Sequence, residues 1–131
     1  MSKPHRNKQS SHTYKGHFHL PKALLENSDF AHLSGKATKL LVDIGSQFNG
    51  YNNGDLCIAL KLMKARGWNS NDSLNKAKQE LLERDLITLT KQGGLGMGPN
   101  LYAITWQPIH ECGGKLDVAS TTIAPRKLCE N

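Results

Sequence analysis

The sequence predicts a small α/β domain that is mainly helical and has an antiparallel sheet of two or three strands. Three stretches repeat apolar residues at helical spacing, over residues 35–48, 59–66 and 71–84. Two later runs, 86–90 and 101–106, are rich in β-branched and aromatic residues and flank a glycine-rich segment. The chain has 131 residues, which is enough for one domain with tails.

The first predicted helix has a clear start, one apolar face and a clear end. Ser34 is a suitable N-cap, because its hydroxyl can accept a hydrogen bond from the first helical turn. Asn49 and Gly50 favour the end of the helix, since both residue types tolerate the left-handed conformation. The apolar positions form a single stripe that we expect to be buried: Ala37, Leu40, Leu41, Ile44 and Phe48.

The second and third predicted helices are joined by a corner of three or four residues that begins at Gly67. This is the length and composition of a helix-turn-helix corner. We expect helix two to turn Leu62 and Met63 inward. Ser70 is a suitable N-cap for helix three. The buried face of helix three is expected to consist of Leu74, Ala77, Leu81 and Leu82.

Glycine content separates the two β-rich runs. Residues 93–100 contain four glycines and a proline and cannot form a helix, so the runs on either side are expected to pair as a hairpin with a long tip. A phosphate-cradling loop would need a helix after the glycines, whereas a strand follows here. The apolar residues 56–58 are expected to form one further, brief strand.

The segments that flank this core differ from it in composition. Residues 1–16 are basic and polar, and we expect a disordered arm because they cannot bury enough apolar surface. The domain proper is expected to span residues 17–108, and it begins with a short helix after Pro21. Apolar residues before residue 35 are expected to brace the domain, and residues 109–131 are expected to form an irregular tail. The bracing residues are Phe18, Leu24, Leu25 and Phe30.

The net charge indicates the class of binding partner, and the cysteine content indicates the cellular compartment. The net charge of +6 favours an acidic partner, with nucleic acid ahead of an anionic membrane surface. The three cysteines, an odd number without a close pair, argue against a disulfide framework and suit a reducing cytoplasm. The sequence shows no transmembrane run and no secretory signal, so we expect a cytoplasmic protein without a membrane partner.

The order of these elements resembles a bacterial winged helix-turn-helix DNA-binding domain, as found in phage and plasmid replication proteins and in small transcriptional regulators. The resemblance covers residues 30–106, about three-fifths of the chain. The stretches that match are Leu40-Leu41, Leu62-Met63, Ser73-Leu74-Asn75-Lys76-Ala77 with Glu80-Leu81, and Asp85-Leu86-Ile87. It implies that helix three enters the major groove of duplex DNA, while the wing and the basic arm contact the backbone or the minor groove.

Candidate DNA-binding residues follow from that placement. Side-chain amides can pair twice with the edge of adenine, whereas helix three lacks the arginines that usually contact guanine. A solvated polar helix face is the alternative interpretation of the same residues. The candidates are Ser70, Asn71, Ser73, Asn75, Lys76, Lys78 and Gln79 in helix three, Lys91 and Gln92 in the wing, and Lys3, Arg6 and Lys8 in the arm.

The biological role stays open between several classes. We expect a transcriptional regulator, with replication or maintenance of a mobile element, or a protein-interaction module, as alternatives; a homodimer is possible in each case. No catalytic motif is present, so we expect neither an enzyme nor a cofactor. The pairs His17/His19 and His110/Cys112 have no second pair at a zinc spacing, so no metal site is expected.

Overall fold

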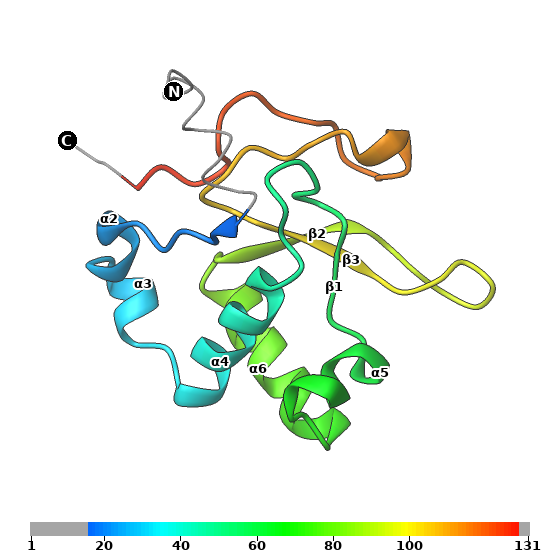
Figure 1. Ribbon diagram of the computed structural model, residues 1–131, viewed down its shortest axis with the longest axis horizontal. Coiled ribbons are helices and arrows are strands. Elements are labelled where there is room, and N and C mark those ends of the chain that lie inside the picture. Colours follow the sequence, from blue (N-terminus) through cyan, green and yellow to red (C-terminus); the bar gives the residue numbers. More distant parts are fainter. Residues whose placement is uncertain (1–15, 129–131) are drawn as a thin grey trace, which may run out of the picture.

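The computed structural model describes residues 16–128, and these form a mixed α/β fold with mainly helical content (Figure 1). The two longest helices are α4 and α6; β1 lies between them in the chain, and β2 and β3 follow α6. In chain order the elements are α2 (Lys22–Leu25), α3 (Ser28–Ala31), α4 (Gly35–Gly45), β1 (Leu56–Cys57), α5 (Leu60–Met63), the 3₁₀ turn η2 (Lys64–Arg66), α6 (Asn71–Glu83), β2 (Ile87–Lys91), β3 (Leu101–Ile104) and the 3₁₀ turn η3 (Cys112–Gly114).

The three strands form one antiparallel sheet in the order β1-β3-β2. Leu56 pairs with Tyr102 across β1 and β3, and Ile87 pairs with Ile104 across β2 and β3. An irregularity in β2 between Leu89 and Lys91 shifts the pairing by one residue. The expected hairpin and the expected brief strand are therefore both present, and they belong to the same sheet.

The core lies between the sheet and the two longest helices, α4 and α6 (Figure 1). Ala37, Leu40, Leu41 and Ile44 are fully buried, which confirms the stripe predicted for the first helix. The predicted caps are also confirmed, since Ser34 Oγ accepts a hydrogen bond from the Ala37 N–H at 3.1 Å. The corresponding bond in α6, from the Ser73 N–H to Ser70 Oγ, is 3.2 Å long.

The first helix ends at Gly45, three residues before the predicted end at Phe48. The side chain of Asn52 donates to the Gln47 carbonyl at 2.8 Å and accepts from the Asn49 N–H at 2.9 Å. These contacts stabilise a loop where further helical hydrogen bonds were expected. Phe48 remains buried in spite of this.

Two apolar side chains point outward where burial was expected. Leu62 is 51% exposed, whereas its neighbour Met63 is buried. Adjacent residues of a helix point about 100° apart, and in α5 the direction of Met63 faces the core while that of Leu62 faces solvent. Leu25, at the end of the short helix α2, is also exposed, although Leu24 beside it is fully buried.

A buried asparagine joins the loop before β1 to the end of β3. The Asn53 Nδ2 donates to the carbonyls of Ile104, Gln107 and Pro108 at 3.0, 3.2 and 2.9 Å. Its Oδ1 accepts from the Ile104 N–H at 2.8 Å, and its backbone N–H donates to Nδ1 of His110 at 3.0 Å. This side chain therefore fixes the path by which the chain leaves the sheet.

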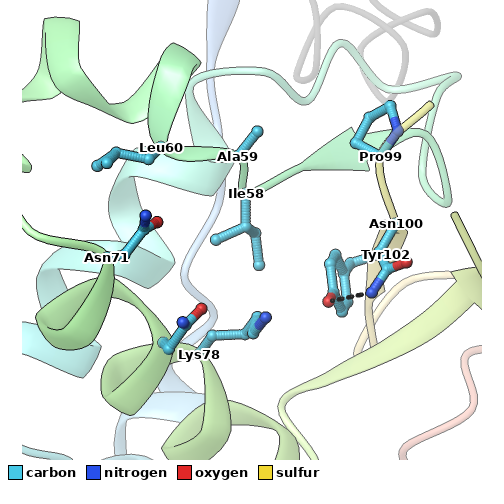
Figure 2. Close-up of a pocket in the computed structure, with 9 residues that line it drawn as sticks. Ile58, Ala59, Leu60, Asn71, Lys78, Pro99, Asn100 and Tyr102 are labelled. Atoms are coloured by element: carbon cyan, nitrogen blue, oxygen red, sulfur yellow. Dashed lines mark hydrogen bonds between the residues drawn. The ribbon is translucent and has the colours of Figure 1, made fainter. Parts of the chain in front are cut away.

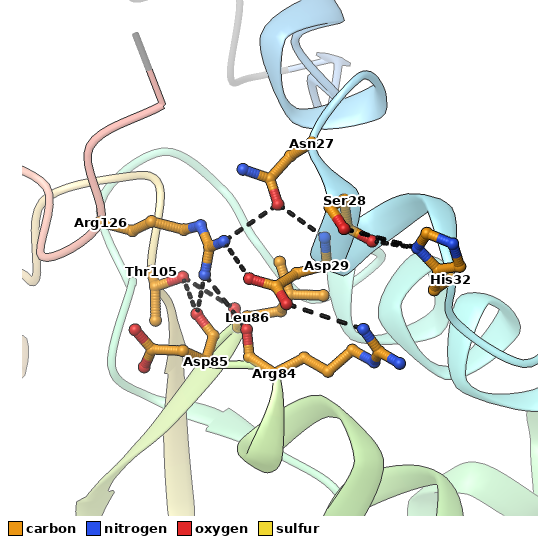
Figure 3. Close-up of polar contacts among 9 residues, drawn as sticks. All are labelled: Asn27, Ser28, Asp29, His32, Arg84, Asp85, Leu86, Thr105 and Arg126. Atoms are coloured by element: carbon orange, nitrogen blue, oxygen red, sulfur yellow. Dashed lines mark hydrogen bonds and ion pairs between the residues drawn. The ribbon is translucent and has the colours of Figure 1, made fainter. Parts of the chain in front are cut away.

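Residues 109–128 contain no helix or strand except η3, but Arg126 attaches this segment to distant parts of the chain (Figure 3). The guanidinium donates to the carbonyls of Arg84 and Asp85 at 3.1 and 3.0 Å. It also donates to Oδ1 of Asn27 at 3.0 Å and to the carboxylate of Asp29 at 2.5 Å. The end of α6, helix α3 and the C-terminal segment meet at this one side chain.

Candidate functional site

A groove separates α6 from the part of the β2–β3 hairpin where the tip joins β3 (Figure 2). Polar side chains of α6 form one wall, and hairpin residues form the opposite wall. The segment that connects β1 to α5 lies between the two walls, and the cavity has a volume of about 160 Å³. The lining residues are Ile58, Ala59 and Leu60 in the connection, Asn71, Asn75 and Lys78 in α6, and Pro99, Asn100 and Tyr102 in the hairpin.

Three predicted site residues, Asn71, Asn75 and Lys78, are brought together on the α6 wall of this groove. Within residues 16–128, no hydrogen bond or ion pair ties any of these three side chains to another part of the chain. Each amide offers two donor hydrogens and an acceptor oxygen, and the lysine offers three donors. The groove therefore presents hydrogen-bonding capacity that the fold does not use.

Asn100, on the opposite wall, has a structural role and was not among the predicted site residues. Its Oδ1 accepts from the Gly93 N–H at 2.6 Å, and its Nδ2 lies 3.4 Å from the Tyr102 hydroxyl (Figure 2). Because these contacts occupy the amide, Asn100 joins the two strands just below the hairpin tip and forms part of the wall that faces α6. Only the strand register brings it opposite α6, and local sequence carries no signal of that register.

Two other predicted residues lie on the outer face of α6 and have partners within the helix. Lys76 Nζ is 3.4 Å from the Asp72 carboxylate, and both side chains are 78% exposed. Gln79 Nε2 is 3.5 Å from the Glu83 carboxylate. Exposed pairs of this kind are weak, so both side chains remain able to exchange these partners for a ligand.

The last two α6 candidates serve the helix start and the contact with α4. Ser70 caps α6, and Ser73 Oγ accepts a hydrogen bond from Lys36 Nζ at 3.2 Å. On the same side Glu80 accepts from both the N–H and the hydroxyl of Ser34, each at 2.7 Å. This side of α6 faces α4, away from the groove.

The predicted wing residues are at the end of β2 and do not line the groove. Lys91 is the last residue of β2, and the Gln92 N–H donates to the carboxylate of Asp117 at 2.8 Å. The Asp117 N–H donates in turn to the Thr90 carbonyl at 2.8 Å. The C-terminal segment thus contacts the hairpin at the end of β2, where the tip begins. The predicted arm residues Lys3, Arg6 and Lys8 lie outside the described residues.

Cations surround the corner between η2 and α6. Lys61, Lys64 and Arg66 are exposed along α5 and η2 without an acidic residue among them. Lys36 and Lys39, from α4, line a second hollow of about 220 Å³ with the corner residues and Ser70. Sequence analysis did not single out these five cations, because they come from separate elements.

Asp43 offsets part of that charge and fixes the corner. Its carboxylate accepts from Lys39 at 2.6 Å, from Arg66 Nε at 3.1 Å and from Trp68 Nε1 at 2.7 Å. Burial alone would raise the pKa of Asp43, but the hydrogen bonds from Lys39, Trp68 and Arg66 outweigh it and hold the pKa below its usual value. This network ties α4 to the turn that orients α6.

Two specific features, a cluster of metal-ligating side chains and a membrane-spanning helix, are absent from residues 16–128. Residues 16–128 contain no group of three or more His, Cys, Asp or Glu side chains that could hold a metal ion. No helix in the same range has both the length and the apolar character needed to cross a bilayer. Cys57 and Cys112 are free thiols, and burial raises the pKa of Cys112.

Comparisons with protein-family models, with curated proteins and with solved structures find no match for this chain.

Proposed function

We propose that this chain is a winged helix-turn-helix protein that binds duplex DNA in a sequence-specific manner. The observation that supports it best is the position of Asn71, Asn75 and Lys78. These side chains lie on the helix that follows the Gly67 corner, face the hairpin, and have no partner within residues 16–128. The order α4, β1, α5, α6, β2, β3, with β3 in the middle of the sheet, supports the winged-helix class.

In this proposal the amides of α6 supply the sequence preference. Asn71 and Asn75 can each donate to N7 and accept from the N6 amino group of adenine in the major groove. Lys78 supplies a donor for a phosphate. Gln79 and Lys76 extend the contact along the outer face of α6 once they leave their partners within the helix.

Attraction to DNA must come from elsewhere, because α6 itself has two lysines and three acidic residues. Two exposed cations, Lys61 and Lys64, follow Leu60, which lines the groove at the start of α5. We propose that these cations and the basic arm neutralise phosphates, while α6 distinguishes the bases. Phosphate contacts give affinity without sequence preference, so the two tasks can be measured separately.

The decisive experiment measures binding of the full chain to a duplex at several salt concentrations by fluorescence anisotropy. If ~4 to 6 phosphates are neutralised, the slope of log K against log salt should be about −4 to −5. Lys61→Ala should reduce the magnitude of this slope by about 1, whereas Lys22→Ala, a matched loss of charge on α2, should leave it unchanged. Absence of duplex binding by micromolar protein at low salt would remove the proposal.

We propose transcriptional regulation as the role of this binding, and it needs its own test. Selection from random duplex DNA would supply the preferred site, which can then be placed in the promoter of a reporter gene. Wild-type protein should change reporter output, and the Asn75→Ala variant should not. Equal output with both proteins, in cells that contain equal amounts of each, would argue against a regulatory role.

A further inference from the structure

The tip of the β2–β3 hairpin presents two apolar side chains to solvent. Leu95 is fully exposed and Met97 is 60% exposed. Figure 1 shows that this tip projects away from the rest of the molecule, beyond the ends of β2 and β3. Single exposed apolar side chains are common on protein surfaces, but these two lie together at the end of a projecting element.

The tip has a defined conformation that holds both side chains outward. The Met97 N–H donates to the Gly94 carbonyl at 2.9 Å, and the Gly94 N–H donates to the Gly98 carbonyl at 3.1 Å. Gly96, between the two apolar residues, has a φ of +75°, which a residue with a side chain adopts only at a cost. The tight turn therefore presents Leu95 at its apex.

The tip is also slender. Between residues 93 and 98 only Leu95 and Met97 have side chains, because the other four residues are glycines. At Gly93 an added Cβ would lie 2.3 Å from the Gly98 carbonyl oxygen, so the neck has no room for a side chain. At ~3.3 Å per residue, four residues extend the tip roughly 13 Å beyond Lys91. This shape suits a narrow cleft better than a flat surface.

We propose that the hairpin tip inserts Leu95 and Met97 into the minor groove of the bound duplex and opens a base step there. This inference rests on the proposed DNA binding. The minor groove is about 6 Å wide, and apolar side chains inserted from it unstack base steps and kink the duplex. A protein partner fits less well, because two side chains fall far short of the ~800 Å² that each partner buries in a stable interface.

The position of the tip relative to α6 supports duplex DNA, and not a protein, as its binding partner. Pro99 and Asn100, directly after the tip, form the wall of the groove that faces Asn71 and Asn75 (Figure 2). A duplex that meets α6 through its major groove therefore runs past the hairpin. Lys91, the last residue of β2, adds a cation two positions before the glycine-rich tip.

The test compares wild-type protein with the double variant Leu95→Ser/Met97→Ser on a duplex that contains the selected site. Energy transfer between dyes at the two duplex ends reports bending. The matched control is Ile123→Ser, which removes an exposed apolar side chain from the C-terminal segment. Wild type and control should bend the duplex, and the double variant should leave it straight while binding about 3- to 30-fold more weakly.

A second duplex series locates the insertion. A flexible TA step at the hairpin position should favour binding by wild-type protein over a stiff A-tract, and the double variant should lose this preference. Equal bending by the double variant and wild type would overturn the inference while leaving DNA binding intact. If wild type and control form dimers without DNA and the double variant does not, the tip instead binds a second copy of the chain. Absence of duplex binding by wild-type protein would remove the proposed function itself.

Discussion

Asn53 and Asn75 have the same side chain in two regions of the molecule, with opposite surroundings. Asn53 is fully buried, and its amide satisfies three carbonyls and one N–H at the end of β3. Asn75 lines the groove beside the hairpin, and within residues 16–128 its side chain bonds to nothing. A structural amide therefore differs from one that is available to a ligand in whether the fold uses its donors and acceptor, and the residue type alone does not separate the two.

The largest expected effect comes from removing the structural amide. Asn53→Ala should lower the free energy of unfolding by roughly 3–5 kcal/mol, because several buried backbone groups lose their partner together. Urea denaturation followed by circular dichroism measures this change. Asn75→Ala serves as the matched control and should stay within about 0.5 kcal/mol of wild type. Similar stabilities for the two variants would contradict the distinction between the two regions.

The α6 amides proposed to contact bases, Asn75 in the groove and Gln79 on the outer face, should show the opposite pattern. Asn75→Ala or Gln79→Ala should reduce preference for the selected site by ~1 to 3 kcal/mol and leave binding to random duplex nearly unchanged. Lys76→Ala or Lys78→Ala should weaken binding to all duplexes alike, because a phosphate contact carries no sequence information. Anisotropy titrations on both duplexes measure the difference. An equal loss on specific and random DNA for the amide variants would contradict base contact.

The basic arm extends the comparison to a segment outside the described residues. Deletion of residues 1–15 removes Lys3, Arg6, Lys8 and Lys15, and should reduce the magnitude of the salt slope by about 2 to 4. The melting temperature should barely change, since the core helices and strands all follow this segment. Anisotropy at several salt concentrations, together with thermal melting, checks both statements. An unchanged slope would show that the arm does not contact DNA.

The smallest expected effect is a pH dependence at the partner of Asn53. Burial lowers the pKa of His110 below its usual value of 6.5, and its Nδ1 accepts the Asn53 N–H only when that nitrogen is unprotonated. As pH falls through about 6.5 the unfolded chain binds a proton before the folded chain does, so stability falls. It levels off below the pKa of folded His110.

Urea midpoints at several pH values measure this effect. In His110→Gln an amide oxygen can accept the same hydrogen bond without titrating, so this variant should have a flatter profile between neutral and mildly acidic pH. Parallel profiles for the variant and wild type would show that His110 does not cause the dependence. Because other groups titrate near pH 4, the comparison is confined to the range above it.

Local signals predicted the helices and strands well and the long-range polar contacts poorly. The apolar stripe of α4 and the caps Ser34 and Ser70 follow from spacing and from hydrogen-bonding chemistry within three residues. Leu62 was predicted to be buried together with Met63, but adjacent helical residues point about 100° apart and α5 buries only the second of them. Asn53 was missed because its partners lie more than 50 positions away.

One wall of the groove was predictable from local sequence, and the other wall was not. Asn71, Asn75 and Lys78 share one face of α6, which helical spacing alone specifies. Pro99 and Asn100 reach that face only because the β2–β3 register and the hydrogen bond from Gly93 to Asn100 fold the hairpin base toward α6. Neither contact has a sequence signature. The winged-helix class and the DNA contacts stay predictions.

The contacts of Arg126 also constrain how this chain folds as it is synthesised. The guanidinium bonds to Asp29 across 97 positions and to the end of α6 across about 40 (Figure 3). Helix α4, α6 and the hairpin can form from residues that leave the ribosome earlier, but the bonds to Asp29 and Asn27 wait for residue 126 to emerge. Contacts of such sequence separation form late and slow the final step of folding. A nascent chain stalled before this point would lack the Arg126 contacts, and the Arg84–Asp29 ion pair of 3.7 Å would remain between the end of α6 and α3.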